Sequence, residues 1–208
     1  MKFSRSVLGT AAAALLACIA APASAQSFVC LTNDSGQCPA VASQVAMTVS
    51  DLGSNQVAFK FDNNGPVASS ITDVYWEASA LTGTVSINDS GSGVSFSWGA
   101  SPPNPGGGAG WNAEFDADSN FPTAFNGVNP GEWVRFVFNY SGTFASLLGG
   151  INDNSSHVAL HVQAIGTSGE SDWIQTTTPP VPEPETYALM LAGLGVVGFM
   201  ARRRRQQA

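Results

Sequence analysis

Residues 134–140 read Val-Arg-Phe-Val-Phe-Asn-Tyr, and the side chains at every second position from Val134 to Tyr140 are apolar. Arg135 and Asn139 fall on the opposite side of an extended chain, because successive side chains of a strand point to opposite faces. A period of two residues is typical of a β-strand with one buried face and one solvated face. The stretch therefore predicts a half-buried strand of an antiparallel sheet.

The same alternation recurs along most of the chain. Clear runs lie at 45–49, 57–61, 94–98 and 158–164, and weaker runs lie at 71–78, 85–87 and 173–176. Asn, Asp, Gly and Pro supply turns at 63–66, 88–91 and 129–131. Seven or eight short strands with one apolar face each predict an all-β fold of two antiparallel sheets packed face to face. We expect an Ig-like or jelly-roll-like β-sandwich over residues 26–178.

Two segments of this domain depart from the alternation. Thr143 can cap a short helix over Phe144–Leu148, which the following two glycines would end. Residues 101–110 read Ser-Pro-Pro-Asn-Pro-Gly-Gly-Gly-Ala-Gly, so we expect a flexible surface loop without core residues.

The first 25 residues have the pattern of a secretory signal peptide. Lys2 and Arg5 form a positive start, Val7–Ala21 is an apolar run, and Ala23-Ser24-Ala25 is a small-x-small cleavage site. We expect cleavage after Ala25. An alternative is a lipid on Cys18, since Leu15-Leu16-Ala17-Cys18 is loosely like a lipoprotein box and a lipid there would anchor the N-terminus.

The last 30 residues, 179–208, combine three features in a fixed order. Val181-Pro182-Glu183-Pro184 precedes an apolar span of 15 residues, Tyr187–Ala201, and Arg202-Arg203-Arg204-Arg205 follows it. A free membrane helix needs about 20 residues, but arginines that snorkel and a locally thinner bilayer can close the gap. We expect a single transmembrane helix with the four arginines on the cytoplasmic side. The domain before it would then lie outside the inner membrane.

Residues 181–205 resemble the PEP-CTERM sorting tail of Gram-negative bacteria. The resemblance implies that Pro182-Glu183-Pro184 is recognised by an exosortase, a membrane-embedded cysteine protease that cuts near it. It also implies an ectodomain that is anchored in the inner membrane first and then reaches the cell surface or the extracellular space. The two prolines hold this segment extended, which suits recognition by a protease.

The charge between the two terminal segments is strongly negative. Lys60 and Arg135 are the basic residues there, against thirteen acidic ones, which leaves a net charge of −11. Nucleic acid is excluded as a partner because its binding requires basic residues that neutralise phosphate. Anionic lipid headgroups are disfavoured for the same reason.

Cys30 and Cys38 remain after removal of the signal peptide. In an oxidising periplasm they most simply form a disulfide around Asn33-Asp34-Ser35-Gly36. A redox or metal role would need a Cys-x-x-Cys pair or a nearby histidine, and the sequence has neither around these positions.

Two groups of side chains invite a metal interpretation. His157 and His161 lie four residues apart in a predicted strand, about 13 Å, which is too far to share a metal. Asp116, Asp118 and Asn120 begin like a calcium loop, but Phe121 and Gly127 stand where an EF-hand needs Gly and Glu. A looser Ca²⁺ site with ligands from residues 152–154 stays open beside the simpler interpretation, an Asp/Asn-rich turn. No other cofactor is expected.

Trp133 is out of phase with the apolar residues that follow it, which makes it a candidate for an outward ring that stacks on sugar, although a core position with contacts at its rim is the favoured interpretation. No catalytic set emerges: Gly-x-Ser-x-Gly is absent from the sequence, and neither histidine has a spacing that points to a partner.

The sequence therefore predicts a non-enzymatic exported protein with a structural or adhesive role in exopolysaccharide and biofilm matrix. The alternative is a carbohydrate- or Ca²⁺-binding module. An enzyme would require a deep pocket in which carboxylates and His161 converge.

Overall fold

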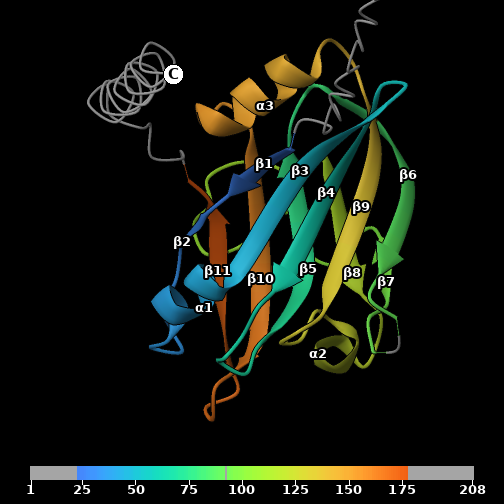
Figure 1. The fold of residues 1–208 in the computed structure, drawn as a ribbon. Coiled ribbons are helices and arrows are strands. Elements are labelled where there is room, and N and C mark those ends of the chain that lie inside the picture. Colours follow the sequence, from blue (N-terminus) through green and yellow to red (C-terminus); the bar gives the residue numbers. More distant parts are fainter. Residues whose placement is uncertain (1–22, 92, 178–208) are drawn as a thin grey trace, which may run out of the picture.

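The computed structural model describes residues 23–91 and 93–177, whose eleven strands form two antiparallel sheets (Figure 1). The five-stranded sheet has the order β1 (Ala23–Gln26), β3 (Val45–Gly53), β4 (Gln56–Asn63), β9 (Trp133–Tyr140) and β6 (Leu81–Asp89). The six-stranded sheet has the order β2 (Phe28–Cys30), β11 (Glu170–Thr176), β10 (His157–Ile165), β5 (Ser70–Glu77), β8 (Phe115–Ser119) and β7 (Phe96–Trp98). The two sheets are stacked as the layers of a β-sandwich.

The prediction of seven or eight strands was too low. β1 and β2 are edge strands of only four and three residues, too short for a period to be read from sequence. β8 contains Asp116 and Asp118, which resemble a turn in composition. It forms a strand because it pairs with both β5 and β7.

Aromatic side chains from both sheets fill the core. Trp76 of β5 is fully buried and meets Phe136 and Phe138 of β9 edge to face, with ring centroids 4.9 and 5.0 Å apart. Phe59 and Phe61 of β4 contact the same indole. The alternation around Val134 therefore points the aromatic residues inward, as expected, and edge-to-face pairs add to the energy of burial.

Three helices join the strands: α1 (Cys38–Gln44), α2 (Thr123–Asn126) and α3 (Phe144–Asn152). The predicted cap of α3 is confirmed, since Thr143 Oγ1 accepts a hydrogen bond from the Ser146 amide at 3.1 Å. The predicted end at Gly149 was wrong. The helix continues because it buries Ile151 on the same face as Phe144 and Leu147.

The predicted signal peptide and the predicted membrane helix lie at the two ends of the chain. β1 spans the predicted signal-peptide cleavage point, with Ala25 paired to Thr48 of β3. In the part of the chain that the structure covers, no helix is long and apolar enough to cross a membrane. The expected membrane span at 187–201 lies outside the described residues.

Candidate functional site

The outer face of the five-stranded sheet, here called the open face, carries polar side chains around one tryptophan. Its centre consists of Lys60 and Asp62 on β4, Trp133 and Arg135 on β9, and Asn88 on β6. The strands place Lys60 directly across from Arg135, and Asp62 directly across from Trp133. Arg135 also faces Asn88 on its other side. The register of three strands thus gathers these five side chains on one surface.

Each cation of the open face has its own contacts. Lys60 Nζ lies 5.2 Å from the centroid of the Trp133 ring and pairs with the carboxylate of Asp62. Arg135 Nη2 donates to Asn88 Oδ1 at 3.1 Å. The Nε of Arg135 is buried without a hydrogen-bond partner among the described residues. Trp133 is half-buried, as are Lys60 and Arg135, so part of each remains accessible.

Lys60 and Arg135 are the two basic residues between the terminal segments of the sequence, and both lie on the open face. The open face is therefore the most cationic surface of a domain that is otherwise acidic. A flat sheet that offers an aromatic ring, two cations and an amide has the groups needed to contact a sugar ring and a carboxylate.

The outer face of the six-stranded sheet, here called the covered face, lies beneath the segment 99–114. Tyr75 Oη donates to the Pro102 carbonyl at 2.9 Å, and the Ala100 amide donates to Asp116 Oδ1. Gly106 and Gly107 lie so close to the Trp173 ring that an added Cβ would stand 2.8 and 2.7 Å from it. The segment packs on the outer face of the sheet, and as expected residues 101–110 form a surface loop without core residues. Its glycines allow the backbone to approach the indole.

Trp111, which belongs to the same segment, also packs on the sheet. Its ring stacks on His157, with centroids 5.4 Å apart, and its Nε1 donates to Gln175 Oε1 at 3.3 Å. His157 Nδ1 in turn lies 2.6 Å from Glu77 Oε2. The two predicted strand histidines therefore have separate partners, and His161 lies deeper along β10.

A row of side chains crosses the covered face beside this segment. The register aligns Trp173, His161, Asp73 and Asp118 on four successive strands. His161 stacks on Trp173 at 4.4 Å, and its Nδ1 lies 3.1 Å from Asp73 Oδ2. Thr72 Oγ1 donates to the same oxygen at 2.7 Å. Sequence reasoning missed Asp73, which lies in a run with only weak alternation.

One carboxylate of this row, Asp118, has a shifted pKa. Burial, followed by the negative charge of Asp73, raises the pKa of Asp118 to about 6. Burial and the surrounding aspartates also raise the pKa of Tyr75. Carboxylates and His161 do converge here, which is one of the two features that an enzyme would require. The hollow of about 590 Å³ in the described surface lies elsewhere, beside β2 and α1.

Two of the three suggested calcium residues, Asp116 and Asp118, lie in strand β8 instead of a turn, and Asn120 follows the end of that strand. Asp116 and Asp118 point to the same side of β8, and Asp116 is bonded to the Ala100 amide. Asn120 bridges Ser95 and Ser97 through its side chain at 2.8 and 2.9 Å. Among residues 23–91 and 93–177, no group of three or more His, Cys, Asp or Glu side chains is placed to hold a metal.

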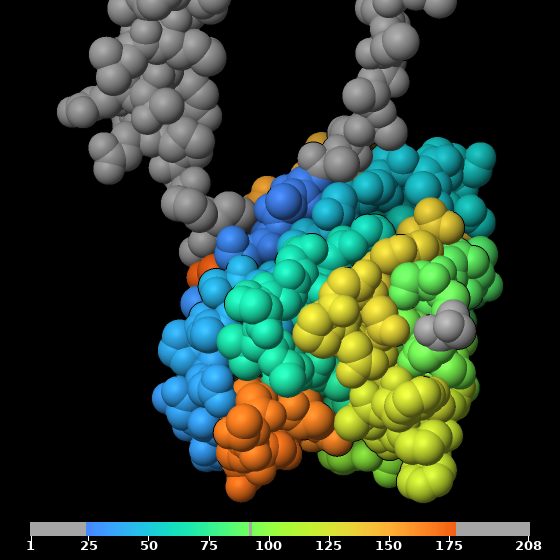
Figure 2. All heavy atoms as spheres, turned by 60° about the horizontal axis from the view of Figure 1, so that its bottom comes forward, coloured from blue at the N-terminus to red at the C-terminus, as the bar shows by residue number. Residues whose placement is uncertain are grey.

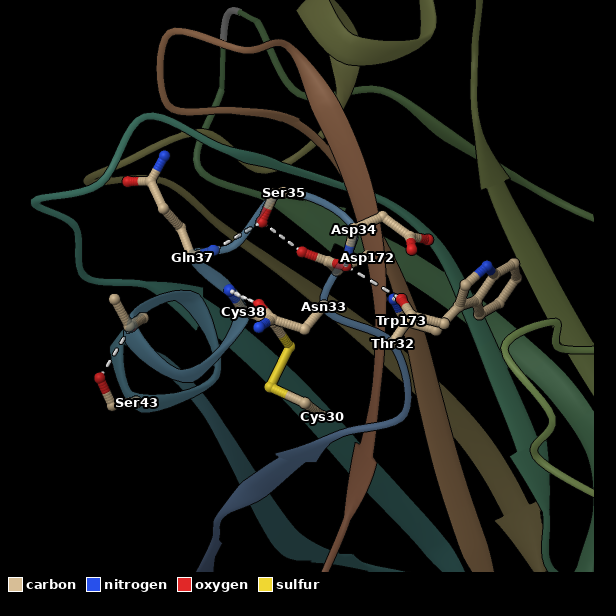
Figure 3. Close-up of a disulfide and its surroundings, with 11 residues drawn as sticks. Cys30, Thr32, Asn33, Asp34, Ser35, Gln37, Cys38, Ser43, Asp172 and Trp173 are labelled. Atoms are coloured by element: carbon tan, nitrogen blue, oxygen red, sulfur yellow. Dashed lines mark hydrogen bonds between the residues drawn. A yellow bond between two sulfur atoms is a disulfide. The ribbon is translucent and has the colours of Figure 1, made fainter.

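Cys30 and Cys38 are joined by a disulfide that ties β2 to the start of α1 (Figure 3). The loop between them is held by Asp172 of β11, a fully buried carboxylate. It accepts hydrogen bonds from Thr32 Oγ1 at 3.0 Å, from the Asp34 amide at 2.6 Å and from Ser35 Oγ. Sequence reasoning missed this role of Asp172, because its three partners lie about 140 residues away along the chain.

The residues of the sorting prediction lie beyond the described part of the chain. They are Val181, Pro182, Glu183 and Pro184 of the motif, and Arg202, Arg203, Arg204 and Arg205 of the basic end. Cys18 and the rest of residues 1–22 lie outside it as well.

Comparison with known proteins bears on this C-terminal segment. No curated protein and no solved structure matches the chain. Residues 180–205 match the model of the PEP-CTERM protein-sorting motif. The chain thus carries a PEP-CTERM sorting motif over residues 180–205, which supports export and sorting through an exosortase.

Proposed function

We propose that this protein is a non-catalytic component of the extracellular matrix, with a structural or adhesive role, and that its open face binds exopolysaccharide. The observation that carries the proposal is the placement of Trp133, Lys60 and Arg135 on one sheet face. A pyranose ring can lie on the indole, while the cations contact an acidic group of the polymer.

The charge of the domain narrows the class of polysaccharide. An acidic protein meets an acidic polymer favourably only where cations are concentrated, and here both lie beside Trp133. We therefore expect a preference for polymers that carry carboxylates, such as uronic acids, over neutral glucans. Added salt should weaken the first kind of binding more than the second.

Binding of the full-length protein to exopolysaccharide isolated from its host tests the proposal. Trp133→Ala should raise the Kd for the polymer about tenfold, the effect of losing roughly 1.4 kcal/mol of contact energy. Trp111→Ala is the matched control, because Trp111 is also half-buried but belongs to the covered face. Equal losses in the two variants, or none in Trp133→Ala, would remove the open face as the binding site.

The proposed route to the matrix follows from the two ends of the chain. A signal peptide cut after Ala25 and an anchor followed by four arginines would place the domain in the periplasm until an exosortase cuts near Pro182-Glu183-Pro184. Intact masses from membrane, surface and medium fractions test this route. A surface species that begins at Gln26 and ends near Pro184 is expected. A full-length C-terminus found only in membranes would contradict it.

Calcium binding is a second candidate, favoured by one observation. Asp118 Oδ1 is buried without a hydrogen-bond partner among the described residues, and Asp73 is its cross-strand neighbour. Carboxylate oxygens are the ligands that Ca²⁺ prefers. Millimolar Ca²⁺ should raise the melting temperature of the wild type but not of Asp118→Asn. An unchanged melting temperature in both would remove this candidate.

A further inference from the structure

A hollow of about 590 Å³, here called the groove, lies beside the disulfide. It is lined by residues 27–30, by Pro39, Ala42 and Ser43 of α1, and by Val45 at the start of β3, and none of these residues is charged. Val29 remains 43% exposed, so the groove presents apolar surface to whatever enters it. Its volume lies within the range of about 300–1,000 Å³ that is typical of sites for small ligands. The groove can therefore hold a few residues of a peptide.

The described part of the chain ends at the rim of this groove. The Thr177 amide donates to the Ser27 carbonyl at 3.1 Å, and Ser27 is one of the lining residues. Thr176 is paired with Phe28, the next lining residue, in the same register. Figure 2 shows the red-orange end of β11 at the left, beside the blue and light-blue residues of β2 and α1. Residues 178–184 therefore begin directly at the groove.

The composition of residues 178–184 suits an apolar groove. They read Thr-Pro-Pro-Val-Pro-Glu-Pro, and Glu183 carries the one charge. Proline has no backbone N–H, so it brings no donor that an apolar wall would leave unsatisfied. Its fixed φ also lowers the entropy that is lost when an extended segment is held in place.

We propose that residues 178–184 occupy the groove of their own molecule and so withhold Pro182-Glu183-Pro184 from the exosortase. Seven residues of an extended proline helix span about 20 Å, whereas residues 27–30 span about 10 Å along their strand. The segment is thus long enough to turn at the rim and cross the groove. The withholding of the motif rests on the sorting route proposed above, but the docking does not.

Attachment at Thr177 favours this segment over a free partner. A short tether gives an effective concentration in the millimolar range, so a contact too weak to hold two separate molecules suffices within one molecule. Residues 178–184 bring a single negative charge, whereas a second copy of the domain brings a net charge of −11. Repulsion therefore opposes a second copy far more than it opposes this segment.

Docking would make release from the groove a condition of processing. A protease needs the backbone and side chains of its recognition segment to be free, so it can bind only the molecules whose segment has left the groove. Its apparent affinity for the chain falls in proportion to that free fraction. Occupancy of the groove then sets the rate at which the domain leaves the membrane.

Photo-crosslinking of the full-length protein, produced without an exosortase, tests the docking. With benzoylphenylalanine in place of Val181, we expect crosslinks within one molecule that map to residues 27–45. Ser43→Arg places a long cation in the groove and should lower their yield at least about fivefold by displacing the segment. Ala40→Arg is the matched control, because it adds the same side chain to an exposed position of α1 that does not line the groove.

The groove variants separate docking from mere nearness. A probe on a tethered segment can react with nearby residues by chance, and that reaction does not depend on Ser43. Equal yields in Ser43→Arg and Ala40→Arg would therefore overturn the docking. Crosslinks mainly between two molecules, or mainly outside residues 27–45, would overturn it as well. Val29→Ser is a second groove variant, which removes apolar surface without added bulk and should also lower the yield.

Pulse-chase labelling in the native host tests the withholding of the motif. Ser43→Arg should shorten the half-life of the uncut chain at least about twofold, because the release of a segment that is docked half of the time doubles the accessible fraction. Ala40→Arg should match the wild type. Equal half-lives in all three chains would overturn the withholding. No cutting in any of them would contradict the sorting route and the withholding with it, while the crosslinks still decide the docking.

Discussion

The open face and the covered face are built on the same kind of antiparallel sheet, yet they differ in what lies above them. On the open face, Lys60, Trp133 and Arg135 remain half-exposed. On the covered face, Tyr75 is fully buried because the segment 99–114 lies across it. The comparison teaches that outward position in a strand does not by itself mean contact with solvent. Whether an outward side chain contacts solvent also depends on how segments distant in sequence pack over the sheet.

The two faces consequently use their aromatic residues differently. Trp173 on the covered face is enclosed by Tyr75, His161 and two glycines of the covering segment. Trp133 on the open face contacts Lys60, and no covering segment is packed on it among the described residues, although both tryptophans are half-buried. We therefore assign stability to the first tryptophan and ligand binding to the second.

Replacing Trp173 or Trp133 by alanine should give the largest difference in stability between the two faces. Trp173→Ala is expected to lower the free energy of unfolding by about 3 kcal/mol, because the covering segment and His161 lose their common support. Trp133→Ala should cost less than about 1 kcal/mol, since its ring contacts mainly one lysine. Urea denaturation of both variants measures the difference. Similar losses would mean that the faces do not differ in this way.

A glycine pair sharpens the account of the covering segment. Gly107 and Gly108 both have positive φ, +66° and +77°, but only Gly107 lies against Trp173. Gly107→Ala should therefore destabilise the protein by about 1–3 kcal/mol more than Gly108→Ala, which carries the same backbone strain without the clash. Melting temperatures of the two variants provide the test. Equal values would show that the segment does not press on the indole.

The covered face should make one acid-dependent contribution to stability, through Asp118. The pKa of Asp118 rises from 3.8 to about 6 on folding, so the folded state holds this proton more tightly than the unfolded chain does. This contribution to stability is present at low pH and declines as pH rises from about 4 to 6. Asp118→Asn should remove the decline and be more stable than wild type at pH 7. Urea midpoints at pH 4, 5 and 7 measure this.

An exposed carboxylate provides the control for that experiment. Glu170→Gln on β11 should leave the pH profile unchanged, because Glu170 is exposed and lies away from Asp73. A wild-type midpoint that stays flat from pH 4 to 7 would contradict the coupling of Asp73 and Asp118. If Glu170→Gln changed the pH profile as much as Asp118→Asn does, that result would also contradict the coupling.

The smallest expected effect concerns Lys60. Lys60→Gln removes a partly exposed ion pair with Asp62 and the contact with Trp133, so stability should fall by only about 0.5 kcal/mol. Binding to a carboxylated polysaccharide should lose much of its salt dependence in this variant. Binding measured at 50 and 300 mM salt tests this. An unchanged salt dependence would mean that Lys60 does not meet the polymer.

The sequence allowed the strands around Val134 and Trp76 to be predicted, because alternation reports directly on a two-faced sheet. It also offered Trp133 as a candidate for an outward ring, because its phase differs from that of Phe136, but it favoured a core position for this residue. The covering of Tyr75 could not be predicted, since it depends on how residues 99–114 pack on strands elsewhere in the chain. The row of Trp173, His161, Asp73 and Asp118 was hidden for the same reason: register between four strands is a property of the assembled sheet.

Tryptophan oxidation by hydroxyl radicals, with and without exopolysaccharide on the full-length protein, tests the central claim most directly. The account predicts that the polymer lowers the oxidation of Trp133 toward that of the fully buried Trp76, while Trp111 and Trp173 keep their rates. Unchanged oxidation of Trp133, or protection of Trp111 and Trp173 instead, would contradict the assignment of binding to the open face.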